Sequence, residues 1–156
     1  MDPQSSAPVP GDPGPARRRS MTGPEKWSLH LSALAVGGTG LGYGWLKYFH
    51  PRAGEFGPEP WPAQGWSQHA HVLAAPVLVF TLGLLVRGHV LPAMRAGGMD
   101  GRRSGLVMAA ILAPMILSGY AIQVCLGPGA RAAMAWVHGP FSLLFLLAYG
   151  VHLARG

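Results

Sequence analysis

Residues 131–154, RAAMAWVHGPFSLLFLLAYGVHLA, form an almost uninterrupted apolar run that contains two histidines. A helix needs about 20 residues to cross the hydrocarbon core of a bilayer, which is about 30 Å thick. The run is therefore long enough to span a membrane. His138 and His152 lie 14 positions apart in it. At about 100° per residue they project from nearly the same helix face, about 21 Å apart along the axis.

Three further apolar stretches approach or exceed this length, at residues 27–49, 69–91 and 104–124. Proline, glycine or charged residues bound each of them, as expected at helix ends. Four spans with short connections predict an all-α integral membrane protein, an up-down-up-down four-helix bundle over residues 26–156. Residues 1–25 are rich in Pro, Gly and Ser and predict a disordered cytoplasmic tail.

Composition excludes several classes of protein. The chain is 49% hydrophobic and only 12% charged, against about 25% charged in a typical soluble domain. Its net charge is +6, but the basic residues lie between apolar runs, which argues against a nucleic-acid partner. One cysteine, Cys125, excludes an internal disulfide, a cysteine zinc cage and a covalent haem site. No acidic residue falls within a span, so no acid pair suits hydrolysis.

The distribution of Lys and Arg predicts the orientation of the spans. Nine of the 12 would lie on one side, namely Arg17, Arg18, Arg19, Lys26, Arg87, Arg95, Arg102, Arg103 and Arg155. The other side holds Lys47, Arg52 and Arg131. We therefore expect both termini on the cytoplasmic side of a bacterial inner membrane. Arg95, Arg102 and Arg103 could also pair with propionates of an inner haem.

Histidine is the informative residue type here. All seven histidines fall within or at the ends of the apolar runs. An imidazole in lipid needs a partner, so each is a candidate for a functional site. The spacing of His138 and His152 suits two stacked macrocycles, one near each membrane surface. A haem iron with two protein ligands then needs a second imidazole from another helix at the same depth.

Helix order predicts which histidines pair. The start of the first span and the end of the fourth share the cytoplasmic side, which places His30 beside His152. The starts of the second and fourth spans share the outer side, which places His138 beside His71 or His69. His69 and His71 point about 200° apart, so only one faces the bundle. We favour His71, because it lies deeper in the span.

His89 is a less favoured alternative to His30. It lies 18 residues after His71, or five full turns, and so shares its face. That distance is about 27 Å, against about 21 Å between His138 and His152, which places His89 about one turn too close to the cytoplasm. We interpret His50, before Pro51, as a surface residue.

A histidine early in the first span (KWSLHLSA), another early in the second (SQHAHVLAA) and two on the fourth (WVHGPFSLLFLLAYGVH) resemble the bacterial cytochrome b-561 family and the b-type cytochrome subunits of nickel-iron hydrogenases. The resemblance covers about residues 26–155. It implies two b haems with His30, His71, His138 and His152 as axial ligands. It also implies electron exchange with quinone or quinol. The chain departs from the family in Leu31, where Trp commonly follows the histidine, and in Pro140, which would lie in the first turn of its helix or kink it.

Two polar or glycine-rich stretches admit more than one reading. The glycines of residues 37–44, GGTGLGYG, are spaced for close helix contact or for a flat porphyrin, and no phosphate-loop lysine follows them. Ser118, Tyr120 and Gln123 could bond a quinone or a propionate, or could simply link helices. A periplasmic redox protein or a larger respiratory complex is a further possible partner. The alternative function is a haem-free membrane subunit or assembly factor, with a transition metal held by His50, His69, His71 and His138.

Overall fold

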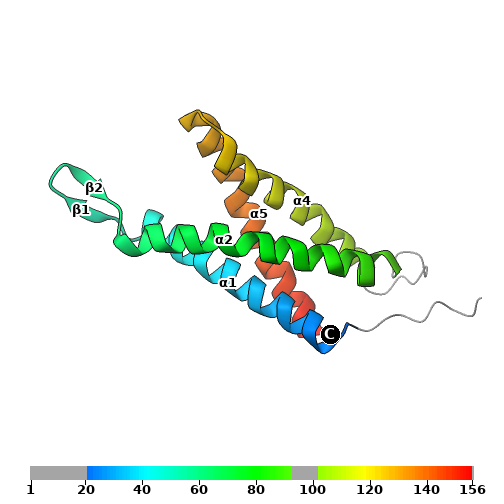
Figure 1. Cartoon of the computed structure of the whole chain (residues 1–156). Helices are drawn as coiled ribbons and strands as arrows, with labels where there is room; N and C mark the ends of the chain where they lie inside the picture. Colours follow the sequence, from blue (N-terminus) through cyan, green and yellow to red (C-terminus); the bar gives the residue numbers. More distant parts are fainter. Residues whose placement is uncertain (1–20, 93–101, 156) are drawn as a thin grey trace, which may run out of the picture.

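The computed structural model describes residues 21–92 and 102–155, which form long helices and one small hairpin of strands (Figure 1). In chain order the elements are α1 (Gly23–Tyr48), β1 (Arg52–Gly54), β2 (Gly57–Glu59), α2 (Pro62–Leu85), the π-helix η1 (Val86–Val90), α4 (Arg102–Val124) and α5 (Pro128–Arg155). The prediction of a mainly helical chain with four long helices is confirmed. Most of the predicted tail, residues 1–20, lies outside the described residues.

Helix α1 begins earlier than its apolar pattern predicts. The Thr22 hydroxyl accepts a hydrogen bond from the Glu25 backbone N–H, and the Glu25 carboxylate accepts one from the Thr22 N–H at 2.8 Å. This reciprocal capping box satisfies N–H groups that a helix start leaves free. Residues 23–25, which we had assigned to the tail, therefore belong to the helix.

Three helices contain an internal proline: Pro76 in α2, Pro114 in α4 and Pro140 in α5. Each proline lacks a backbone N–H and so removes one helical hydrogen bond. Because α5 begins at Pro128, Pro140 is not in its first turn, which was one of our two expectations. Transmembrane helices tolerate internal prolines where neighbouring groups satisfy the freed carbonyls.

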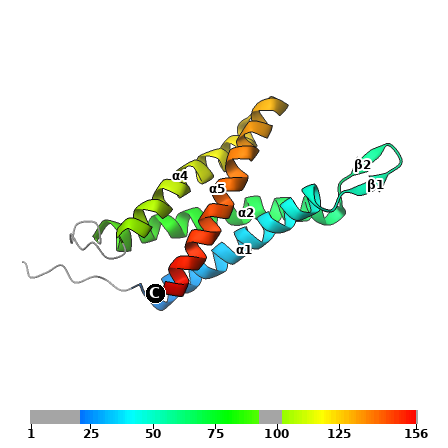
Figure 2. The ribbon, with the colours of Figure 1, turned by 180° about the vertical axis from the view of Figure 1, so that it is seen from behind.

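The four long helices form two hairpins. Helix α1 packs along α2, and α4 packs along α5. Both views show the hairpins crossing, with their far ends diverging towards β1–β2 on one side and towards the α4–α5 turn on the other (Figures 1 and 2). The C-terminal end of α5 lies beside the start of α1. The first and fourth predicted spans therefore share one end of the molecule.

A small apolar core joins the two hairpins. Leu29 and Ala33 of α1 and Leu78 of α2 are buried together, and Tyr149 of α5 packs against them. Gly37 lies where α1 and α5 approach each other, because a Cβ there would lie 2.9 Å from a methyl carbon of Leu146. A small residue at such a position lets two helices pack closely.

Three helical segments are long and apolar enough to cross a membrane: Pro62–Gly88, Leu106–Val124 and Pro128–Ala154. Large apolar side chains on them face outward, including Leu73, Leu117 and Trp136. Soluble monomers rarely expose such continuous apolar surface, so the described helices are consistent with a membrane protein. Helix α1 is not among these three segments, and its role as a fourth span stays a prediction.

The connection between α1 and α2 contains a short hairpin that was not predicted from the sequence. β1 and β2 pair antiparallel, with Gly54 opposite Gly57. Gly57 has φ of +122°, a conformation that favours glycine because it has no Cβ. The hairpin projects beyond the ends of α1 and α2 (Figure 1).

Candidate paired-histidine site

His71 lies in the first half of α2 and is half-buried against α1. Its Nδ1 lies 2.9 Å from the Val36 carbonyl oxygen and 3.4 Å from the Thr39 hydroxyl. One turn earlier in α2, the Ser67 hydroxyl donates to the Thr39 carbonyl at 2.7 Å. Two polar links therefore fix α2 against α1 at this level.

His138 occupies the corresponding place in the second hairpin. It lies on α5 and is half-buried against α4. Its Nδ1 lies 2.8 Å from the Met115 carbonyl oxygen and 3.5 Å from the hydroxyl of the buried Ser118. Ser118 is one of the residues that we considered for a quinone or a propionate, and its oxygen is engaged between helices instead.

These contacts determine which nitrogen of each ring carries the proton. A carbonyl oxygen only accepts hydrogen bonds, so Nδ1 of both His71 and His138 must be the donor. In a neutral imidazole the other nitrogen, Nε2, then keeps its lone pair. Metal-bound histidines typically show this arrangement, with the second ring nitrogen donating to a carbonyl or carboxylate. Both rings therefore have the tautomer needed for coordination through Nε2.

The two rings lie close together, in a T-shaped arrangement, where the two hairpins meet. Their centroids are 6.0 Å apart and their planes meet at 81°. Two imidazoles on opposite sides of one iron have ring centres about 6 Å apart, since each metal–nitrogen bond is about 2 Å long. The separation of His71 and His138 therefore fits a pair of axial ligands, as well as a direct contact between rings.

The structure separates His71 from His69. His69 is exposed, whereas His71 is turned inward beside His138. The helical alternation that we used to separate them accounts for this difference, because residues two apart on a helix face different ways. His50 stacks on Trp61 at 5.5 Å just after the C-terminal end of α1 and lies on the surface, as its place before Pro51 suggested.

At the other end of the molecule, His30 of α1 meets Tyr149 of α5. The His30 Nδ1 is 2.5 Å from the Tyr149 hydroxyl, and Trp27 packs edge-on to the same imidazole. Tyr149 stacks in turn on Phe145, a core residue that is only 2% exposed. We did not single out Tyr149 from the sequence, although it lies one turn before His152 on the same helix.

The predicted pairing of His30 with His152 has no ring contact among the residues that the structure describes. His152 lies exposed near the end of α5. The side chain of His89, the alternative inner ligand, is outside the described part of the chain, as are those of Arg95, Arg102 and Arg103. The structure thus brings His71 and His138 together, and it places His30 and His152 on helices that adjoin at the same end.

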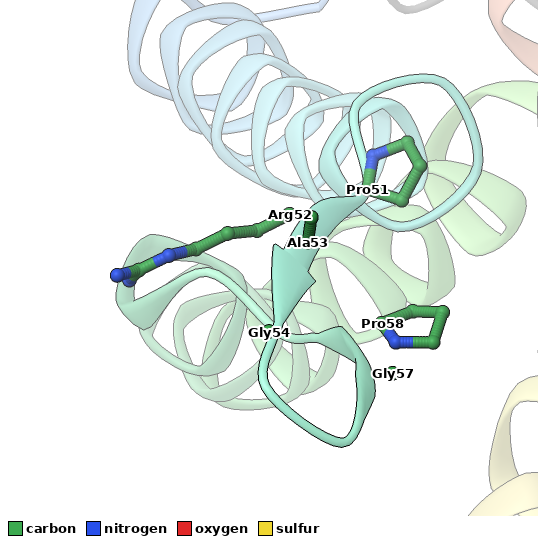
Figure 3. Close-up of a pocket in the computed structure, with 6 residues that line it drawn as sticks. All are labelled: Pro51, Arg52, Ala53, Gly54, Gly57 and Pro58. Carbon is green, nitrogen blue, oxygen red and sulfur yellow. The ribbon is translucent and has the colours of Figure 1, made fainter.

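One open depression lies at the β1–β2 hairpin, away from His71 and His138, with a volume of about 340 Å³. Its lining consists of Pro51, Arg52, Ala53, Gly54, Gly57 and Pro58 (Figure 3). The Arg52 side chain points away from it, and the guanidinium lies over the Trp61 ring at 5.7 Å. Proline rings and glycines offer no set of ligands there, so this depression has no recognisable chemistry.

Within residues 21–92 and 102–155, no group of three or more His, Cys, Asp or Glu side chains gathers to hold a metal ion. His71 and His138 therefore form a pair, and no third ligand joins them in the described part of the chain. Comparison of the chain with family models, curated proteins and solved structures finds no match.

Proposed function

We propose that the chain is a transmembrane b-type cytochrome that carries electrons between two haems and exchanges them with the quinone pool. The close pair of His71 and His138 carries this proposal. Both rings donate through Nδ1 to a main-chain carbonyl and leave Nε2 available, and their centroids lie 6.0 Å apart. A b haem bound between them would supply an iron that takes up and releases one electron.

The chain's own groups would hold and tune this cofactor. His71 and His138 would supply the nitrogen ligands, and the carbonyls of Val36 and Met115, by accepting hydrogen bonds from Nδ1, would increase the basicity of both rings. The apolar side chains of the four helices exclude water, which is one of the factors that set a reduction potential. A second haem held at His152 would lie about 21 Å along the helix axis from His138, which is the rise of 14 residues.

We assign the inner haem to His30 and His152. Tyr149 supports this assignment, because it holds the His30 imidazole through Nδ1 from the helix that also carries His152. The proposal places both termini in the cytoplasm of a bacterial cell, with an up-down-up-down bundle across the inner membrane and α1 as a span. Quinone or quinol is the lipid-side partner in this scheme, and a periplasmic redox protein or a larger respiratory complex is the other.

The haem-free alternative has less support. A transition metal held by protein donors alone needs three or four of them around one ion, and no such group forms among the described residues. A haem-free assembly factor would instead use the histidines only to link helices. The absorption spectrum of the purified protein distinguishes this alternative from the cytochrome.

The test is a pyridine haemochrome assay on protein purified in mild detergent from cells supplied with haem. The wild type should contain two b haems per chain. His138→Ala and His71→Ala should each retain one, and the exposed neighbour variant His69→Ala should retain two. A colourless wild-type protein would overturn the proposal. A wild type with one haem that is lost in His138→Ala would leave the outer site standing and remove the inner one.

A further inference from the structure

The two hairpins hold their histidines in the same way. In α1 the contacts come from the Val36 carbonyl, the Thr39 hydroxyl and the backbone at Gly40. In α4 they come from the Met115 carbonyl, the Ser118 hydroxyl and the backbone at Gly119. Both sets occupy positions n, n+3 and n+4, which share one face of a helix. We call each set a histidine cradle.

The distances in the two cradles agree closely. The carbonyl contacts are 2.9 and 2.8 Å, and the hydroxyl contacts are 3.4 and 3.5 Å. A Cβ at Gly40 would lie 2.9 Å from His71 Cε1, and a Cβ at Gly119 would lie 2.9 Å from His138 Cε1. In both cases Nδ1 is the next nearest ring atom, at 3.0 and 3.1 Å, and Nε2 follows at 3.9 Å. Each ring thus lies with its Cε1–Nδ1 edge against a glycine.

The Thr39 and Ser118 hydroxyls act as acceptors towards Nδ1 because each donates its own proton within its helix. Thr39 donates its proton to the Ala35 carbonyl at 2.6 Å, and Ser118 donates to the Pro114 carbonyl at 2.5 Å. With the proton used one turn back along the helix, the oxygen is left as an acceptor. The N–H of each imidazole is therefore shared between a carbonyl and a hydroxyl oxygen.

We propose that Gly40, Gly119, Thr39 and Ser118 are positioning residues that fix the two imidazole planes nearly perpendicular across the outer haem. This inference rests on the proposed function. The glycines admit the ring edges, and the oxygens set the rotation of each ring about its Cβ–Cγ bond. Because each cradle belongs to a different hairpin, the angle of 81° between the rings is set by how the two hairpins cross.

The test compares Gly40→Ala and Gly119→Ala with Gly38→Ala and Gly139→Ala, where an added Cβ meets nothing within 4 Å. Haem content is measured together with the electron paramagnetic resonance spectrum of the oxidised protein. Perpendicular imidazole planes give a highly anisotropic low-spin ferric signal, whereas nearly parallel planes give a rhombic one. The wild type, Gly38→Ala and Gly139→Ala should show the anisotropic signal of the outer haem.

In Gly40→Ala and Gly119→Ala the outer haem should bind 10- to 100-fold more weakly, the typical loss when a ligand's supporting contact is removed. Any outer haem that remains should lose its anisotropic signal, while the inner haem stays. Thr39→Val and Ser118→Ala are milder variants that serve if the alanine variants fail to fold. They should raise the midpoint potential of the outer haem, because a less basic ligand favours the ferrous iron, and Thr39→Ser should restore it.

Two results would overturn the inference. One is a set of cradle variants that match Gly38→Ala in outer-haem affinity, signal and potential. The other is a rhombic outer-haem signal in the wild type. Both leave the proposed function intact, since it requires only that haem be bound. A wild type without haem would remove the proposed function, and the inference with it.

Discussion

On the proposed function, replacing Tyr149 with Phe should weaken the inner haem site alone. The substitution deletes the hydroxyl that lies 2.5 Å from His30 Nδ1, and it keeps the ring that stacks on Phe145 with planes 8° apart. The apolar core beside Leu29 and Leu78 is therefore retained. The variant removes one polar contact and almost no packing.

The size of the effect follows from the role of the hydroxyl. Loss of the group that orients a metal-bound histidine typically weakens cofactor binding 10- to 100-fold, which corresponds to about 1.4 to 2.7 kcal/mol. Among the described residues, Tyr149 makes no hydrogen bond or ring contact with the outer cradles. Val36 and Tyr149 share only the apolar cluster of Leu29, Ala33 and Leu78, which Tyr149→Phe leaves packed. We therefore expect inner-haem affinity to fall by this factor, with outer-haem affinity unchanged.

The assay is a haem titration of apoprotein in detergent, in which each site is followed by its own step in a redox titration. His30→Ala sets the limit of complete loss of the inner haem, and Tyr48→Phe, an exposed tyrosine of α1, controls for removal of a phenol. An inner site unaffected by Tyr149→Phe would refute the reasoning. A variant that lost both haems would also refute it, because the levels would then not be independent.

Three further predictions concern stability and topology. Phe145→Ala should lower the free energy of unfolding by up to about 3 to 5 kcal/mol, because it opens a cavity beside Tyr149. The part of that range that comes from removing the ring from water does not apply inside a bilayer. Steric-trap unfolding measures the change, and a value below about 1 kcal/mol would contradict the prediction. Gly57→Ala should destabilise the β1–β2 turn by about 1 to 2 kcal/mol, because residue 57 has a positive φ. Proteolysis at the turn should become faster, and haem content should not change. Equal cleavage of the variant and the wild type would contradict this prediction. Of reporters fused after residue 156, only those that work in the cytoplasm should be active. A cysteine substituted at Phe56, which is 94% exposed, should be labelled only from the outside of the cell. Labelling from the cytoplasmic face would contradict the predicted topology.

Hydrophobic run length predicts the helices of this chain well, because four long apolar segments leave little else to form. The helix ends depend on local chemistry that run length ignores. Thr22 and Glu25 extend α1 backwards through paired hydrogen bonds. The π-turn η1 at the end of α2, and the strands β1 and β2, have no signal in apolar periodicity.

For the site, periodicity places His71 and His138 on faces that meet, which is the arrangement observed. Periodicity does not predict which groups of the neighbouring helices contact the imidazole rings. Thr39, Gly40 and Tyr149 come from other helices, so their role depends on how helices are rotated against each other. The spacing shared by Val36-Thr39-Gly40 and Met115-Ser118-Gly119 is visible in the sequence only once the contacts are known.

The principal acceptors for the outer histidines are main-chain oxygens, of Val36 and Met115. No change of side chain at these two positions can delete an oxygen that every amino acid carries. We therefore expect positions 36 and 115 to tolerate many apolar replacements in a mutational scan, although the contacts they make are central. Intolerance should instead appear one turn further along each helix, where bulk decides whether a ring still fits.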